Sequence, residues 1–245
     1  EGCNMGCSFC VVPFTRGREE HRSYDDIVAE AERRVGEGVV QLDLLGQTVN
    51  AWRDGGRYFP DLLSRVGAIP GLRRLRFTSS HPAYVGARLA EAMADTPAIC
   101  PHIHLPVQSG SDRVLAAMGR GYTAGQYRRR VETLRRHLPG LAVSTDIIAG
   151  YPGETEDDFG ATLKLLEDVR FSQVLAFKYS PRPNTRAQAI EDDVPDAVKS
   201  RRLGELFALQ DDLGRRQHEA LVGSRQKVLF DGPSRQDAGV ASGRT

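Results

Sequence analysis

The chain has 245 residues, a formal net charge of +1, 40% hydrophobic and 27% charged residues, and a mean hydropathy of -0.39. These values indicate a soluble globular protein, long enough for one large domain or two small ones with a sizeable core. No apolar run approaches the ~18 residues that a membrane span requires, and no signal peptide precedes the first motif, so a membrane or secreted protein is not expected.

The first ten residues, "EGCNMGCSFC", place three cysteines at C-x3-C-x2-C spacing, and the rest of the chain holds one more, Cys100. This usage does not make an extracellular disulfide framework, so a reducing cytoplasm is the expected location. A disulfide uses two thiols and a tetrahedral zinc site uses four ligands. Three thiolates suit a [4Fe–4S] cluster in which one iron is left open to a small molecule. We therefore expect Cys3, Cys7 and Cys10 to be cluster ligands.

Zinc is the competing interpretation, with Cys100, His102 or His104 as the fourth ligand. Zinc sites usually pair their ligands in two short knuckles, and the sequence offers no second knuckle. We expect His102 and His104 to face opposite sides of a predicted strand, and Cys100 to be a buried small hydrophobic residue. The spacing favours iron–sulfur, and the zinc reading stays open.

Beyond this loop, apolar β-rich runs alternate with helical patterns at a spacing of ~30 residues, which predicts right-handed βαβ crossovers and a parallel sheet. Three helix starts carry a capping pair. In each, a hydroxyl residue is followed three positions later by a side chain that can reach back to the N–H of that residue. The first helix should end at Gly36 or Gly38. The predicted strands are 39–47, 72–80, 100–108, 142–152 and 172–181, and the capping pairs are Ser23 with Asp26, Thr123 with Gln126, and Thr155 with Asp158.

Polar residues gather where these strands end, and the carboxyl ends of parallel strands form the active face of such folds. Since Glu1 is not a start methionine, we expect the chain to begin inside a longer protein, just past a strand that it does not contain. The cysteine loop would then lie on the same face. The polar residues are Gln47, Ser79, Ser80, His81, Gln108, Ser109, Asp146, Tyr179 and Ser180.

A long amphipathic helix is predicted from Pro195 to Val222, and Gly223 ends it. Residues 223–245 combine a short β-like run with Gly/Pro turns and several arginines, as at the start of a small β-domain. The predicted domains are therefore 1–222 and 223–245. The tail from Arg215 is basic, which is compatible with an anionic partner or with simple solvation.

The cysteine motif, with an aromatic residue directly before its last cysteine, resembles the signature of the radical S-adenosylmethionine (SAM) enzymes. Six blocks spread over nearly the whole chain resemble, more narrowly, the radical SAM tRNA methylthiotransferases. The resemblance implies a partial (β/α)6 barrel whose first strand is missing, followed by the start of a TRAM domain, the tRNA-binding β-barrel of that family. The blocks are "EGCNMGCSFCVVPFTRG", "LLGQTVNAW", "FTSSHP", "HLPVQSGSDRVLAAMGRGYT", "STDIIAGYPGET" and "FKYSPRPNT".

The function implied by this resemblance is methylthiolation at C2 of isopentenyl-adenosine next to the tRNA anticodon. It proceeds through a 5′-deoxyadenosyl radical, sulfur insertion and SAM-dependent methylation. A sister activity on threonylcarbamoyl-adenosine in tRNA or on a ribosomal-protein aspartate is the alternative, and a zinc nucleic-acid-binding module without catalysis is the remote one. The implied partners are the tRNA anticodon stem-loop and an electron donor such as flavodoxin or ferredoxin. The protein itself is expected to be monomeric and cytoplasmic, and not to bind a membrane.

By the same resemblance, Phe9 lies near the adenine of SAM, or is a simple core aromatic. Gln47 lies near the SAM amino group, Gln108 and Ser109 near its ribose and carboxylate, and Asp146 and Gly150 near its adenine. His81 is a weaker candidate for substrate contact, and Arg16 and Arg18 could meet tRNA phosphates. No catalytic residue is assigned.

The resembling enzymes hold a second [4Fe–4S] cluster in an amino-terminal domain with three further cysteines, which this sequence lacks. We expect this chain alone to bind one cluster and not to methylthiolate RNA. The sequence leaves the sulfur source and the physiological reductant unassigned.

Overall fold

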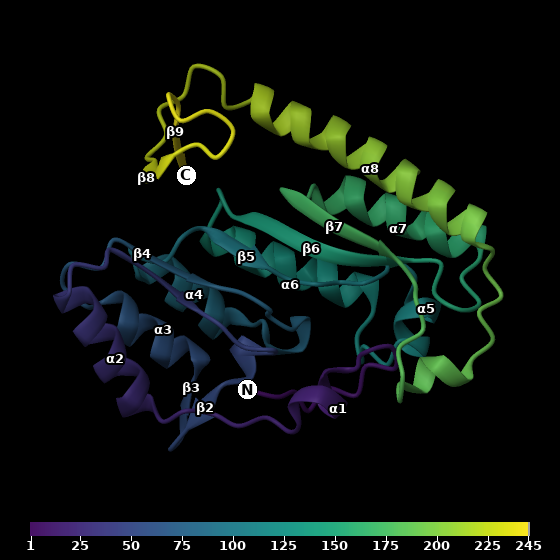
Figure 1. Ribbon diagram of the computed structural model, residues 1–245, viewed down its shortest axis with the longest axis horizontal. Helices are drawn as coiled ribbons and strands as arrows, with labels where there is room; N and C mark the ends of the chain where they lie inside the picture. Colours follow the sequence, from purple (N-terminus) through teal and green to yellow (C-terminus); the bar gives the residue numbers. More distant parts are fainter. Residues whose placement is uncertain (245) are drawn as a thin grey trace. The chain divides into compact units, whose positions relative to one another are not determined.

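The computed structural model describes residues 1–244 and divides the chain into two compact units, Glu1–Gly214 and Arg215–Thr245. The first unit is built on parallel strands that alternate with helices, as the sequence predicts (Figure 1). The strands are β1 (Gln41–Leu44), β4 (Arg74–Phe77), β5 (His102–His104), β6 (Ala142–Ala149) and β7 (Gln173–Lys178). The helices that follow or precede them are α2 (Tyr24–Gly36), α3 (Phe59–Gly67), α4 (Ala87–Asp95), α6 (Ala124–His137) and α7 (Glu156–Val169).

The parallel strands follow one another in space in the order in which they occur in the chain. β1 pairs with β4, and β5, β6 and β7 pair in that order, all in parallel. The two groups meet at Leu75, whose N–H donates to Ala98 O at 2.7 Å and whose carbonyl accepts from Cys100 N at 3.0 Å. The result is an open, partial parallel barrel.

The helices form one continuous layer, because α2 contacts α3, α3 contacts α4, α4 contacts α6, and α6 contacts α7. Two of the three predicted capping pairs are confirmed in full and the third in part. Thr123 with Gln126 and Thr155 with Asp158 form complete capping boxes, whereas the Ser23 hydroxyl accepts from the Asp26 N–H alone. Helix α2 ends at Gly36, as predicted.

The shorter elements were not predicted. They sit in the connections and have too few residues to show a periodic pattern. They are α1 (Val12–Arg16), α5 (Asp112–Ala117), the hairpin β2 (Arg53–Asp54) with β3 (Arg57–Tyr58), and the 3-10 turns η1 (Val49–Ala51), η2 (Pro82–Tyr84) and η3 (Arg186–Ala189).

The predicted carboxyl-terminal helix is α8 (Asp196–Glu219), and the division between the two units falls inside it, after Gly214. In the second unit, β8 (Leu229–Pro233) and β9 (Ala241–Arg244) form an antiparallel hairpin with an irregularity between Phe230 and Gly232. The predicted β-like run is thus present, and its assignment to a TRAM domain stays a prediction. None of the helices in residues 1–244 is both long and apolar enough to cross a membrane.

Candidate metal centre and cofactor face

Cys3, Cys7 and Cys10 lie half-buried on the irregular segment before α1, and none is in a disulfide. The segment folds back on the residues after α1, where the Cys3 N–H donates to Gly17 O at 3.2 Å. Gly2 makes this approach possible, since its φ is +76° and a Cβ there would lie 1.9 Å from Arg18 O. The three cysteines therefore lie on a loop whose path requires a glycine at position 2.

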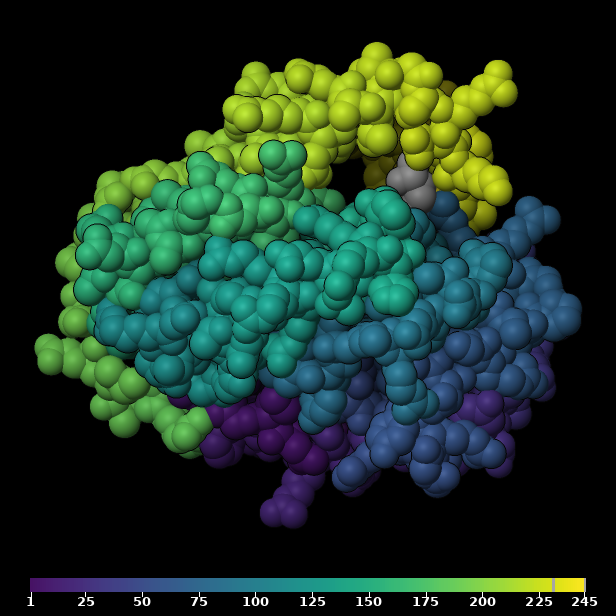
Figure 2. All heavy atoms as spheres, turned by 180° about the vertical axis from the view of Figure 1, so that it is seen from behind, coloured from purple at the N-terminus to yellow at the C-terminus, as the bar shows by residue number. Residues whose placement is uncertain are grey.

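The cysteine loop is held by segments far away in the sequence. Ser8 donates its N–H to Met118 O at 2.8 Å, and its hydroxyl lies 2.8 Å from the Tyr151 hydroxyl. The Ser8 carbonyl accepts from Ala187 N at 2.8 Å, and Arg186 donates to the carbonyl of Gly6. Seen from behind, the purple N-terminal residues lie against the green segment that follows β7 (Figure 2). The loop is thus fixed by the end of α5 and by η3.

The three sulfurs are near one another and have polar neighbours. Burial raises the pKa of the Cys10 thiol above its usual value, and the charges of Cys7 and Cys3 raise it further. Thr48 Oγ1 lies 3.2 Å from Cys3 Sγ, and Met5 N donates to the same sulfur at 3.4 Å.

Cys7 Sγ accepts a hydrogen bond from Arg120 Nη1 at 3.2 Å. N–H groups directed at ligand sulfurs are among the contacts that stabilise and tune iron–sulfur clusters. Cys100, by contrast, is buried, and the charges that affect its pKa are those of Arg74, Arg76 and Asp43, not of the loop. It does not join the other three.

This donor set fits a [4Fe–4S] cluster with three thiolate ligands. Within residues 1–244, no group of three or more His, Cys, Asp or Glu side chains converges closely enough to hold a single metal ion. In such a cluster each thiolate binds a different iron, so three cysteines on one loop suffice as protein ligands. A tetrahedral zinc site needs a fourth ligand, and Cys100 lies apart from the loop.

The histidines of β5 correct one prediction. His102 Nε2 and His104 Nδ1 lie 3.1 and 3.0 Å from Ser144 Oγ, so both side chains are on the same face of the strand. The prediction of opposite faces was wrong, because residues two apart in a strand point to the same side. His102 also contacts Arg76, and His104 Nε2 lies 3.4 Å from Asp146 Oδ1. These contacts do not favour either ring as a zinc ligand.

Among the residues predicted to bind SAM, Gln47 and Gln108 follow β1 and β5, Asp146 lies within β6 and Gly150 directly follows it. Gln47 is exposed and lines a cavity of about 660 Å³ that also reaches Gly2 and Thr48, next to Cys3. Gln108 is buried with a positive φ of 78°, and its N–H donates to Asp146 O at 2.9 Å. Gln108 and Asp146 are therefore brought together by the backbone.

Ser109 and Phe9 have protein partners. Ser109 is fully buried; its hydroxyl lies 3.4 Å from Thr162 Oγ1 on α7 and accepts from Ser111 N at 3.2 Å. Phe9 packs against a small apolar cluster that includes Met118 and Tyr151. Their predicted contacts with SAM stay predictions, and both residues also have a structural role.

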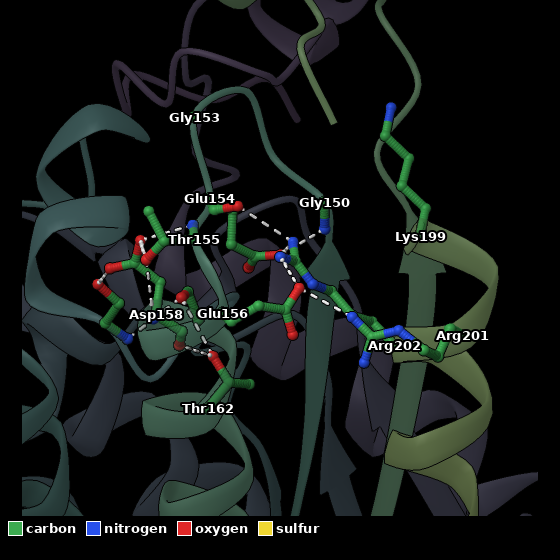
Figure 3. Close-up of polar contacts among 12 residues, drawn as sticks. Gly150, Gly153, Glu154, Thr155, Glu156, Asp158, Thr162, Lys199, Arg201 and Arg202 are labelled. Atoms are coloured by element: carbon green, nitrogen blue, oxygen red, sulfur yellow. Dashed lines mark hydrogen bonds and ion pairs between the residues drawn. The ribbon is translucent and has the colours of Figure 1, made fainter. Parts of the chain in front are cut away.

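Gly150 ends the β6 motif in a conformation that glycine favours, with φ at +75°. Its N–H donates to Glu154 Oε2 at 2.6 Å, and Arg202 Nη1 of α8 donates to the same oxygen at 2.8 Å. Figure 3 shows Arg202 directed at this carboxylate beside Gly150. Burial raises the pKa of Glu154, and the Gly150 N–H and Arg202 oppose that shift. Helix α8 is thereby tied to the loop that follows β6.

Sequence reasoning did not identify Thr48, Arg120, Arg186, Glu154 or Arg202. The first four lie in or directly beside blocks that carry the family resemblance, such as "GQTVN", "GRGYT" and "YPGET". Their position in these blocks is a signal that could have found them. Their contacts could not be predicted, because these depend on segments that only folding brings together.

A search of family models matches residues 1–166 to the one described as Radical SAM superfamily. Among curated relatives, a protein of Acidithiobacillus ferrooxidans named tRNA-2-methylthio-N(6)-dimethylallyladenosine synthase is 50% identical, over 100% of this chain and 55% of its own length. Proteins of the same name from Bordetella petrii and Xanthomonas campestris pv. campestris are 48% and 45% identical, covering 52% and 53% of their lengths. The chain spans about half the length of these relatives.

Solved structures share the fold. The radical S-adenosylmethionine methyltransferase TsrM from Kitasatospora setae superposes with a TM-score of 0.64 at 20% identity, covering 76% of this chain and 37% of that one. Coproporphyrinogen III oxidase from Escherichia coli gives a TM-score of 0.63 at 18% identity, covering 86% of this chain and 51% of that one. At these identities the likeness concerns the fold, and it agrees with the partial barrel described above.

Proposed function

Since the chain belongs to the radical SAM superfamily, we propose that it is the radical SAM part of a tRNA methylthiotransferase. The substrate of the whole enzyme would be adenosine that carries a dimethylallyl (isopentenyl) group next to the anticodon, methylthiolated at C2. The observation that carries the proposal is the set of three free cysteines on one clamped loop, at the face where the parallel strands end. The names of the relatives at 45–50% identity support the substrate branch.

In this proposal Cys3, Cys7 and Cys10 hold a [4Fe–4S] cluster. Bound there, the cluster supplies the electron for reductive cleavage of SAM. The protein's task is to present the thiolates on a fixed loop and to keep N–H and O–H groups near their sulfurs. The contacts of Thr48, Met5 and Arg120 with the sulfurs fit that task.

SAM is proposed to lie over the ends of β1, β5 and β6. Gln47 is exposed and able to contact the amino group, since a side-chain amide oxygen accepts hydrogen bonds. Gln108 would contact the ribose and carboxylate, and Asp146, to whose carbonyl the Gln108 N–H donates, would lie near the adenine. Gly150 would border the adenine through its backbone, with Phe9 near it. Ser109 would contribute through its backbone, because its hydroxyl is turned to Thr162.

The partners follow from the proposed function. Arg16 and Arg18, just beyond the loop, are exposed and suited to phosphates of a tRNA anticodon stem-loop. Residues 223–245 would begin a TRAM domain, and the second [4Fe–4S] cluster would belong to a part of the protein outside this chain. An electron donor such as flavodoxin or ferredoxin, a cytoplasmic location and a monomeric state complete the proposal.

The test begins with anaerobic reconstitution using iron and sulfide. We expect about four irons per chain and broad absorbance near ~400 nm, with an EPR signal in the reduced state that changes when SAM is added. Cys7→Ala should abolish this signal, whereas Cys100→Ala serves as the matched control and should retain it. A colourless protein that binds zinc instead would contradict the proposal, and about eight irons would contradict a single cluster.

The substrate branch is tested in cells. Deleting the full-length gene should remove the methylthio group from dimethylallyl-adenosine in total tRNA, as measured by mass spectrometry of nucleosides. Loss of the methylthio group from threonylcarbamoyl-adenosine or from a ribosomal-protein aspartate would assign the chain to the sister branch instead.

A further inference from the structure

Arg120 is a buried cation whose partners include no carboxylate in the part of the chain that the structure describes. It lies in the loop after α5 and is 5% exposed. Its Nε donates to the Tyr122 hydroxyl at 2.8 Å, its Nη2 to Pro106 O at 2.7 Å and its Nη1 to Cys7 Sγ at 3.2 Å. A buried charge that lacks an opposite charge is costly, so Arg120 requires an anion.

Among the neighbours of Arg120, Arg130 adds a second positive charge. Arg120 Cζ and Arg130 Cζ lie 5.3 and 5.5 Å from the centroid of the Tyr122 ring, and the centroid of the His81 ring lies 5.8 Å from it. Arg130 Nη1 and His81 Nε2 are buried and have no hydrogen-bond partner among the described residues. Of the groups that Arg120 contacts, the Cys7 sulfur is thus the one that becomes an anion when it binds iron.

The protein also fixes the direction of the guanidinium. The Tyr122 hydroxyl that accepts from Arg120 Nε also donates to Val107 O at 3.1 Å, so it is anchored to the segment that follows β5. Gly119 and Gly121 flank Arg120 with φ values of +69° and +67°, and a Cβ on Gly119 would lie 2.9 Å from Gly6 O. These two glycines let the chain bring Arg120 against the cysteine loop.

We propose that Arg120 is a positioning residue of the iron–sulfur centre: its guanidinium holds the Cys7 thiolate in place and balances the negative charge of the cluster. This inference rests on the cluster ligation proposed above. Because reduction adds a negative charge, a fixed cation against a ligand sulfur favours the reduced state and raises the reduction potential. Arg120 should therefore help to retain the cluster and make it easier to reduce.

The experiment uses the full-length enzyme, reconstituted anaerobically and measured without SAM or tRNA. The readouts are iron content and the potential of this cluster, followed by its EPR signal during a redox titration. Arg120→Met should lower the potential and weaken metal binding about tenfold or more. Arg120→Lys keeps the charge and loses the fixed geometry, so its potential should lie between those of Arg120→Met and the wild type. Arg130→Met is the matched control and should leave both readouts near the wild-type values.

An Arg120→Met variant with unchanged potential and iron content would overturn the proposal, even if SAM binding or activity were lost, because Arg120 would then serve another ligand. If Arg120→Met does not fold, as judged by circular dichroism, Arg120→Lys is used instead, and unchanged potential and iron content in that variant would overturn the proposal. A wild-type enzyme that takes up iron only in a second cluster would instead refute the proposed function, and this inference with it.

Discussion

Replacing Glu154 by Gln should destabilise the first unit strongly, because Glu154 and Arg202 form a buried ion pair. Glu154 Oε2 lies 2.8 Å from Arg202 Nη1, and the two side chains are 1% and 3% exposed. The same carboxylate accepts the Gly150 N–H at 2.6 Å (Figure 3). The substitution keeps the shape and an acceptor for Gly150 but removes the charge that faces Arg202.

The size of the effect follows from burial. Removing one partner of a buried ion pair costs about 3–5 kcal/mol, since the other charge stays in the interior without compensation. Arg202 keeps a second carboxylate, that of Glu156 at 2.7 Å from its Nη2, which is largely exposed and should moderate the loss in Glu154→Gln. We therefore expect about 3 kcal/mol for Glu154→Gln and up to about 5 kcal/mol for Arg202→Met. The double variant removes both charges, so its cost should fall short of the sum by about 1–3 kcal/mol.

The assay is urea unfolding of the four proteins, followed by the fluorescence of Trp52, the single tryptophan of the chain. Arg201→Met is the matched control on the same helix. Arg201 pairs with Glu156 at 2.8 Å, but the side chains are 47% and 61% exposed, so its loss should cost less than about 1 kcal/mol. Glu154→Gln costing no more than this control, or strictly additive effects in the double variant, would refute the reasoning.

Three further predictions concern single residues. Gly150→Ala should lower the thermal unfolding midpoint, because φ is +75° and the new Cβ would lie 2.3 Å from Lys199 Cγ; an unchanged midpoint would contradict this close packing. Burial, with Arg120 and Arg130 nearby, lowers the pKa of His81 from 6.5 to about 3, so the stability it contributes is full above pH 6.5 and is lost as the pH falls toward 3. His81→Asn should therefore reduce the slope of unfolding free energy between pH 6 and 4 by about 1.4 kcal/mol per pH unit, and an equal slope would exclude a buried neutral imidazole. Burial alone would raise the pKa of Asp158, but hydrogen bonds from Arg113, Ser111 and Thr155 lower it well below 3.8, so its contribution is full above that pH and declines steadily as the pH falls toward the lowered pKa. Asp158→Asn should therefore destabilise the protein clearly less at pH 2 than at pH 7, and equal losses at both would contradict it.

Local patterns were sufficient to predict the framework of the first unit. Each of the five predicted runs contains a strand, and the three capping pairs mark the starts of α2, α6 and α7, because caps and alternation depend on neighbours within a few residues. The strands are shorter than the runs: β5 has three residues of the predicted nine, since the flanking Pro101 and Pro106 interrupt the ladder. The prediction for His102 and His104 failed because the two-residue period of a strand was applied wrongly, and not because the sequence was misleading.

For the candidate site, the sequence could predict only the proposed ligands. The C-x3-C-x2-C spacing is local, and it indicated the three cysteines that are proposed to bind the cluster. The contacts on their sulfurs come from Thr48 and Arg120, 45 and 113 positions away from the cysteines they meet, and no periodic pattern carries that information. Blocks of family resemblance indicated which segments to examine, but not which side chain would point at the loop.

The loop that carries the cysteines is held mainly by main-chain atoms. Its partners include Gly17 O, Met118 O and Ala187 N, and Arg186 reaches the Gly6 carbonyl. Such contacts depend on the path of the chain and not on the identity of side chains, so most single substitutions leave them intact. They also come from α5 and η3, which are fixed in turn by the barrel core and by packing around Tyr151 and Tyr179. The three cysteines are therefore positioned by the folded barrel as a whole, and changes that loosen the end of α5 or η3 should affect the proposed metal centre without altering a cysteine.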